Sequence, residues 1–264
     1  MSADGPEIAE ALRRLDEITR RLRRECPWDR EQDERTIVPH TVEEAYELAD
    51  AAQRHDDAKL LDELGDVLFQ VHFLSLLMEE RGVGDLSQVA RHVSDKLIRR
   101  HPHVFAQTEV EDAAEVLRNW DAIKATETGR EPGVFGEVPE NLPAPLYARK
   151  VQRRAASSGF DFEGVEAPLL SIGEEVEELR AAGSTDERFH EVGDVLFAAV
   201  NAARKLKVDP ELALRAAADR FRARVQAGVD LAASDGRNWN DLPPDGQLAY
   251  YARARLSEGD PHQT

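Results

Sequence analysis

The pentapeptide Gly65-Asp66-Val67-Leu68-Phe69 occurs a second time, unchanged, as Gly193-Asp194-Val195-Leu196-Phe197. In each copy a glutamate stands three residues before the aspartate, at Glu63 and at Glu191. Residues three apart on a helix lie on the same face, so each copy places two carboxylates side by side, next to an apolar run. The recurrence of this arrangement predicts an internal duplication of the chain.

A second acidic group lies upstream of each copy, as Glu43-Glu44-x-x-Glu47 and as Glu174-Glu175-x-x-Glu178. Taken alone, Glu44 fits a capping acid, because Thr41-x-x-Glu44 matches a capping box that would open a helix just after Pro39. Glu43 and Glu47 alone would fit a solvated helix face. Two acidic pairs in the same order, occurring twice, are harder to ascribe to chance, even in a chain with 52 acidic residues.

Paired carboxylates on two neighbouring helices suit a magnesium ion. Mg²⁺ prefers hard oxygen ligands in octahedral geometry, and it keeps coordination positions for water and for the phosphates of a substrate. Two Glu-x-x-Glu or Glu-x-x-Asp pairs that face each other across antiparallel helices can hold one such ion, or several once triphosphate oxygens join. The pattern therefore predicts, in each half, a magnesium site that suits a substrate with phosphate groups.

Composition limits the classes of partner. The formal net charge of −18 argues against nucleic-acid polymers and anionic membranes as partners, which favour basic surfaces, but it leaves room for a small anionic substrate that binds through cations. Cys26 is the only cysteine, which excludes an internal disulfide and a cysteine-based zinc site. With no apolar signal core and no uncharged stretch that could span a bilayer, a cytoplasmic location is expected.

Every strong segment has helical periodicity, which predicts an all-α fold. A Gly- and Pro-rich stretch at 128–143 predicts a linker between an N-terminal domain, 1–127, and a C-terminal domain, 144–264. The apolar run 67–74 predicts a helix buried at the centre of its unit. The expected helices cover about 7–25, 41–55, 58–81, 86–100 and 111–126 in the first half, and 146–157, 166–182, 185–207, 210–233 and 245–257 in the second.

The chain resembles the MazG-type nucleoside triphosphate pyrophosphohydrolases, an all-α superfamily. The motifs that carry the resemblance are Cys26-Pro27-Trp28-Asp29, Thr41-x-Glu43-Glu44-x-x-Glu47, Glu63-Leu64-Gly65-Asp66 and Asp95-Lys96-x-x-Arg99-Arg100-His101-Pro102-His103-Val104-Phe105. The resemblance implies two tandem helical-bundle domains, each with two acidic metal-binding helices, in a protein that assembles as a homodimer. It also implies hydrolysis of NTPs or dNTPs to the nucleoside monophosphate and pyrophosphate, with Mg²⁺ or Mn²⁺ as cofactor, in the house-cleaning of nucleotide pools.

Site residues follow from the same resemblance, position by position. The implied metal ligands are Glu44, Glu47, Glu63 and Asp66 in the first copy, and Glu175, Glu178, Glu191 and Asp194 in the second. Glu43 and Glu174 are expected to orient or activate the attacking water. The implied contacts to the triphosphate and the base are Lys59, Lys96, Arg100, Trp120 and Lys124 in the first copy, and Arg220, Arg224, Tyr251 and Arg255 in the second.

The two copies differ outside the metal acids. Glu187 stands at the position of Lys59, which reverses the charge, and Ala217-Ala218-Asp219-Arg220-Phe221 departs from the family's usual Ala-Asn-x-Lys-Phe. In two-domain members of the family the C-terminal domain often does most of the hydrolysis. Because the N-terminal copy here has the more complete set of bases, the hypothesis is that it contributes substantially.

Two other interpretations compete with a pyrophosphohydrolase. A carboxylate di-iron bundle needs two Glu-x-x-His motifs, and the sequence has one, Glu187-x-x-His190. A non-catalytic acidic helical scaffold or regulator would be the default for an acidic all-α chain. It does not explain why acids recur at equivalent positions beside the most apolar helix of each half.

Overall fold

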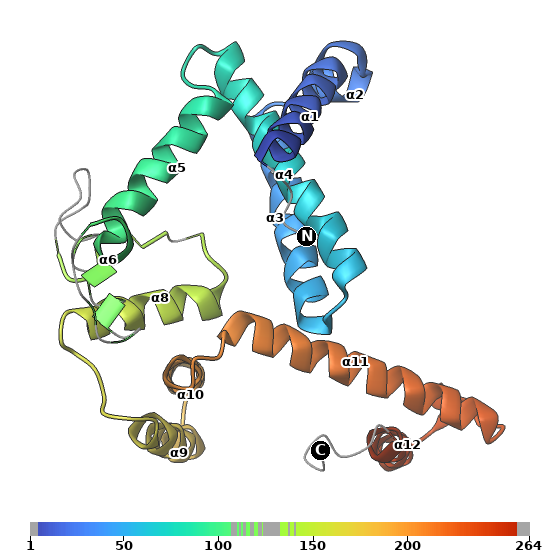
Figure 1. Ribbon diagram of the computed structural model, residues 1–264. Coiled ribbons are helices and arrows are strands. Elements are labelled where there is room, and N and C mark those ends of the chain that lie inside the picture. The colour runs from blue at the N-terminus through green and yellow to red at the C-terminus, as the bar shows by residue number, and fades with distance from the viewer. Residues whose placement is uncertain are drawn as a thin grey trace. The chain divides into compact units, whose positions relative to one another are not determined.

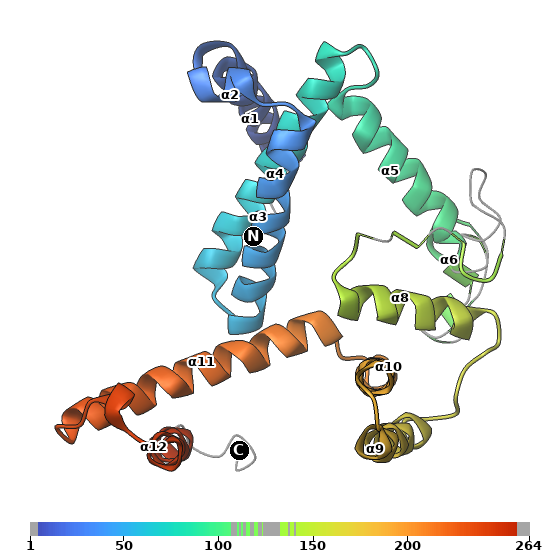
Figure 2. The ribbon, with the colours of Figure 1, turned by 180° about the vertical axis from the view of Figure 1, so that it is seen from behind.

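In a computed structural model of the protein, all regular structure among the described residues is helical (Figures 1 and 2). The all-α prediction is therefore confirmed for this part of the chain. The helix expected over 111–126 falls largely on residues outside it, and so does Lys124. The described residues are 5–106, 110, 112, 115, 116, 119, 120, 123, 133–136, 138, 139 and 141–257.

The chain divides into two units, 1–127 and 128–264, and each is described by itself. In the first unit, α3 and α4 form a hairpin, and α1 packs against α4. Its core is built from Ile37 on α3 and from Phe73 and Leu77 on α4. The helices are α1 (Gly5–Glu25), α2 (Pro27–Glu31), α3 (Glu34–Arg54), α4 (Asp57–Glu80), α5 (Leu86–Arg100) and α6 (Pro102–Phe105).

The start of α3 corrects the sequence prediction. Asp33 is the N-cap: its side chain accepts hydrogen bonds from the backbone N–H groups of Arg35 and Thr36, and Thr36 Oγ1 accepts one from the Asp33 N–H in return. This capping box satisfies the free amides of the first turn, so the helix begins at Glu34 and runs through Pro39. The helix start predicted at Thr41 is wrong, and Glu44, well inside α3, is not a capping acid.

The second unit repeats the acidic hairpin with α9 and α10. A further pair, α11 and α12, packs around Ala232, Leu242 and Tyr250. The helices are α8 (Ala144–Ser157), α9 (Glu166–Ala181), α10 (Thr185–Lys205), α11 (Pro210–Ser234), the short 3₁₀ helix η1 (Trp239–Asp241) and α12 (Pro244–Ser257).

One face of α4 is exposed, which corrects the prediction of a helix buried all round. Phe73 and Leu77 are buried, whereas Leu61, Leu64 and Leu68 are 74%, 50% and 38% exposed. Their spacing of three and four residues puts these leucines on one face. The second unit repeats the feature on α10, where the exposed residues are Phe189, Val192 and Leu196.

Among the described residues, no helix combines the length and the apolar character needed to cross a bilayer. The interpretation of the two units as MazG-like domains joined by a linker at 128–143 stays a prediction.

Candidate metal centres

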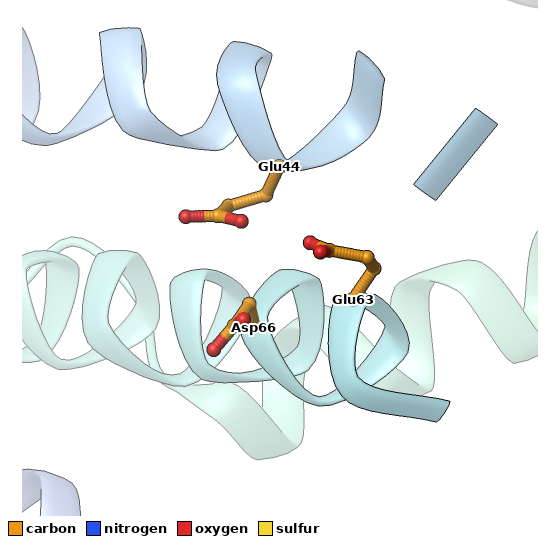
Figure 3. Close-up of side chains that lie close together, drawn as sticks. All are labelled: Glu44, Glu63 and Asp66. Carbon is orange, nitrogen blue, oxygen red and sulfur yellow. The ribbon is translucent and has the colours of Figure 1, made fainter. Parts of the chain in front are cut away.

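The first acidic group lies in the α3–α4 hairpin. Glu44 extends from α3 toward α4, and Glu63 extends from α4 toward Glu44, with Asp66 one turn further along α4 (Figure 3). One carboxylate oxygen from each residue lies within 4.8 Å of the other two. Three of the four acids that the sequence predicted as ligands therefore converge from two helices.

Glu63 is the most buried member of this group. Its side chain is 1% exposed, and both carboxylate oxygens are buried. The Lys59 ammonium contacts Oε1, and beyond it the neighbours of the Glu63 carboxylate are the acids Glu44 and Glu47. A buried carboxylate with unfilled acceptor capacity is costly, and a divalent cation would relieve that cost. The residues present thus fit a hard cation such as Mg²⁺.

The electrostatics of the group support the same fit. Burial raises the pKa of Glu44 above its usual value, and the nearby charge of Asp66 raises it further. The pKa of Glu63 shifts in the opposite direction: the hydrogen bond from the Lys59 ammonium lowers it. Mutual repulsion among clustered carboxylates is the condition that a bound cation reverses.

Glu47, the fourth predicted ligand, lies outside this group of three. Its Oε2 atom is 3.7 Å from Lys59 Nζ, which also lies 3.6 Å from Asp62 Oδ2. Lys59 therefore contacts three acids at once. Glu43 is exposed on α3, and its Oε2 atom is 3.2 Å from His40 Nδ1. The contact between Lys59 and Glu63 was not predicted, although their spacing of four residues on one helix was the available signal.

The second acidic group lies in the α9–α10 hairpin. Glu175 and Glu178 on α9 and Glu191 on α10 bring oxygens within 4.8 Å of one another. Burial raises the pKa of Glu175, and the charges of Glu178 and Asp194 add to the shift. Asp194, one turn after Glu191, lies outside the group of three, and the side chain of Glu174 is exposed. The predicted duplication of the acidic group is thus confirmed: each unit brings three acids together.

Glu187, at the position of Lys59, has a structural partner. Its Oε2 atom accepts hydrogen bonds from the backbone N–H groups of Gly183, at 2.6 Å, and Ser184, at 3.1 Å. Ser184 Oγ accepts one from the Glu187 N–H, which completes a capping box at the start of α10. These backbone donors lower the pKa of Glu187.

The capping role of Glu187 also bears on the di-iron alternative, which needs this residue as a ligand. The Glu187 carboxylate is turned toward backbone amides, and the ring of His190 packs edge-on against Phe189 with centroids 5.7 Å apart. Neither Glu187 nor His190 belongs to the acidic group of this unit. The one Glu-x-x-His motif therefore lacks the arrangement of a di-iron ligand pair.

The aromatic and basic residues predicted for the first copy come together in part. The Arg100 guanidinium carbon lies 5.4 Å from the centre of the Trp120 ring, a cation–π distance. His101 packs edge-on against the same ring, with centroids 4.8 Å apart, a contact that was not predicted. Lys96 is half-buried, one turn before Arg100 on α5.

In the second unit the predicted phosphate and base contacts lie on the α11–α12 pair. Arg220 and Arg224 are on α11, and Tyr251 and Arg255 are on α12. The Tyr251 ring packs against Phe221 with centroids 5.6 Å apart, which joins the two helices. The acidic group of this unit is on the other pair, α9 and α10.

Comparison with known proteins agrees with the geometry. Residues 32–105 match the MazG nucleotide pyrophosphohydrolase domain, a segment that contains the whole first acidic group. The chain is 40% identical over 233 residues to the nucleoside triphosphate pyrophosphohydrolase of Escherichia coli strain K12, covering 84% of this chain and 89% of that one. It is 38% identical over 231 residues to the nucleoside triphosphate pyrophosphohydrolase/pyrophosphatase MazG of Thermotoga maritima, covering 87% and 89%. With both acidic hairpins inside a resemblance of this extent, the chain belongs to the MazG family of nucleotide pyrophosphohydrolases.

Proposed function

We propose that this protein hydrolyses nucleoside triphosphates between the α- and β-phosphates, releasing the nucleoside monophosphate and pyrophosphate in a Mg²⁺-dependent reaction. The observation that carries the proposal is the buried Glu63 carboxylate, whose oxygens face Glu44 and Asp66 in a member of this family. Such a group of acids is suited to a hard cation and, through that cation, to a polyphosphate.

The acidic residues of the first hairpin would have different roles in the reaction. Glu44, Glu63 and Asp66 would hold Mg²⁺, with Glu47 joining when the substrate is bound. The ion supplies Lewis-acid chemistry, because it neutralises phosphate charge and lowers the pKa of water. Glu43, next to the ligands on α3, would orient the attacking water and accept its proton. The water oxygen bonds to phosphorus, the α–β anhydride bond breaks, and pyrophosphate leaves.

Substrate contacts come from the bases and aromatics of the same unit. Lys59 and Arg100 would neutralise charge on the triphosphate as it develops, with Lys96 and Lys124 in the same role. Trp120 would contact the base. In the second unit the corresponding contacts would come from Arg220, Arg224, Tyr251 and Arg255, around a metal held by Glu175, Glu178, Glu191 and Asp194, with Glu174 at the water.

The first unit would contribute substantially to turnover. Its Lys59, ion-paired with Glu63, would carry its positive charge to the phosphate, whereas Glu187 in the second unit is a capping residue with the opposite charge. A substrate that carries several negative charges gains from the first arrangement and is repelled by the second.

Pyrophosphate release by Glu63→Ala and Glu191→Ala, assayed separately across canonical and modified NTPs and dNTPs, tests the proposal. We expect Mg²⁺-dependent release by the unaltered protein and a large loss in Glu63→Ala. Intact activity in Glu63→Ala with none in Glu191→Ala would reject the role of the first unit. No release from any nucleotide would favour the scaffold interpretation. Preference for a damaged nucleotide would support a house-cleaning role.

A homodimer is part of the proposal. The exposed faces of α4 and α10 hold apolar side chains at equivalent positions, Leu61 and Phe189 being 74% and 77% exposed. Apolar faces of this kind are characteristic of surfaces that a partner covers. Because the same face recurs in both units, a second copy of this chain is the partner that matches it.

A further inference from the structure

We propose that Lys59 is a built-in counter-cation that occupies the metal's place in the metal-free first site and must leave it before a divalent ion binds. This inference rests on the proposed function, because it takes the Glu44, Glu63 and Asp66 group as the metal centre. It gives Lys59 a role in metal affinity that is separate from contact with phosphate.

The contacts of Lys59 carry the inference. Its ammonium makes an ion pair with Glu63, the buried acid of the group, and lies 3.7 Å from Glu47 Oε2 and 3.6 Å from Asp62 Oδ2. Two of these three acids, Glu47 and Glu63, are predicted metal ligands. A single positive charge thus lies beside two of the carboxylates that a divalent ion would bind.

The position of Glu47 follows from the same contacts. Glu44, Glu63 and Asp66 lie within 4.8 Å of one another, whereas Glu47 is drawn to the lysine. If the ammonium left Glu63, Glu47 would be released as well, so that all four predicted ligands would be available together. Departure of Lys59 therefore completes the ligand set.

The second unit provides an internal contrast. Its hairpin also gathers three acids. Glu187, however, stands at the position of Lys59, and its carboxylate accepts hydrogen bonds from backbone N–H groups at the start of α10. No lysine needs to be displaced from that position. We therefore expect the second group to bind a divalent ion without this competition, and the first group to bind it more weakly in the absence of nucleotide.

Once a nucleotide binds, the displaced Lys59 ammonium can interact with its phosphates. The Lys59 side chain is 49% exposed, so its long stem can swing from Glu63 toward solvent. A triphosphate that enters with the metal would then form an ion pair with the Lys59 ammonium. Metal and nucleotide should therefore promote each other's binding at the first site, and that coupling should depend on Lys59.

Mn²⁺ binding to the full chain, followed by the electron paramagnetic resonance signal of free Mn²⁺, tests the inference without using activity. Glu175→Gln and Glu191→Gln are present throughout, so that the second group is silent. We expect Lys59→Met to bind Mn²⁺ roughly three- to tenfold more tightly than the Lys59 protein, because one nearby positive charge is gone. Lys59→Arg should keep the weaker affinity.

Arg21→Met is the control, since it removes one positive charge from an exposed position on α1 of the same unit, where Arg21 pairs with Glu25, and should leave Mn²⁺ affinity within twofold. Equal affinity in Lys59→Met and the Lys59 protein would overturn the counter-cation role and leave the metal site standing. A site that binds no Mn²⁺, or binding that persists in Glu63→Gln, would instead reject the metal centre, and this inference with it. Circular dichroism of each variant shows whether the helices are intact.

Discussion

At the scale of single residues, α4 buries two titratable side chains with different fates. Glu63 is buried among acids and faces a lysine, which suits a cation site. His72, about two and a half turns further along, is 3% exposed, and its Nδ1 atom is buried without a hydrogen-bond partner among the described residues. Burial lowers the pKa of His72, and the charge of Asp16 on α1 opposes the shift in part. His72 is thus a neutral core residue that resists protonation.

His72 should make the first unit sensitive to mild acid. Because its folded-state pKa lies below the usual 6.5, the unfolded chain takes up the proton first as the pH falls. The resulting loss of stability begins as the pH drops through about 6.5 and levels off below the folded-state pKa, with a slope of at most about 1.4 kcal/mol per pH unit.

Urea unfolding of the protein and of His72→Gln between pH 5 and 8 measures this dependence. The difference between the two free energies of unfolding isolates His72 from the other histidines. A difference that does not vary with pH would contradict the prediction.

Glu63 should also control the response to metal. With Glu191→Gln in the background to silence the second group, Mg²⁺ should raise the melting temperature by binding the folded first unit. Glu63→Gln should abolish that rise, because a neutral amide is a poor ligand for a hard cation. Glu43→Gln, whose carboxylate faces His40 instead, should keep it. Differential scanning fluorimetry with and without Mg²⁺ makes the comparison, and equal shifts in both variants would contradict the assignment of ligands.

At the scale of elements, the two acidic hairpins are built alike but start differently. Asp56 caps α4 by accepting a hydrogen bond from the Lys59 N–H at 3.0 Å, which leaves the lysine side chain free for Glu63. Ser184 and Glu187 cap α10 reciprocally, which commits the Glu187 side chain to the backbone. The capping interactions thus decide whether the third residue of the helix serves the acidic site or the fold.

Loss of either cap should destabilise its own unit. We expect Ser184→Ala and Asp56→Ala each to lower the free energy of unfolding by about 1 kcal/mol, the usual effect of removing an N-cap side chain. Hydrogen exchange should rise in the first turn of α10 for Ser184→Ala and in that of α4 for Asp56→Ala. Exchange that rises equally in both units for either variant would argue against independent caps.

At the scale of the whole molecule, many apolar side chains stay exposed. In the first unit these include Ile8, Leu12 and Ile18 on α1, in addition to Leu61 on α4. The exposed residues of α4 and α10 follow helical spacing, so they form faces rather than scattered positions. Association would remove these apolar faces from water and so lower the free energy, which is the physical basis of the proposed homodimer.

Charged substitutions on these faces should dissociate the dimer into monomers. We expect the protein to run as a dimer in size-exclusion chromatography with light scattering, and Leu61→Glu or Phe189→Glu to shift it toward monomer. Leu86→Glu, at the first position of α5, is a control for the added charge. A monomer at all concentrations in the unaltered protein would mean that the faces are covered within one chain, and would contradict the homodimer.

Much of the fold could be predicted because helix formation depends on local pattern. The helix expected at 86–100 matches α5, and that at 166–182 ends one residue beyond α9. The start of α3 was missed because Pro39 suggested a boundary, whereas the Asp33 cap stabilises a helix that contains the proline. Burial of α4 on every side was also expected wrongly, since an apolar run does not say whether its own chain or a partner covers it.

The sequence by itself determined the duplication, the all-helical character and the presence of two acidic groups, because a repeated motif and helical periodicity are properties of neighbouring residues. Only the tertiary structure decided which acids meet: Glu44 joins Glu63 and Asp66, whereas Glu47 lies beside Lys59. It also decided that Glu187 caps a helix. Spacing along one helix places side chains on a face, but the packing of two helices and the choice of rotamers decide which of them touch.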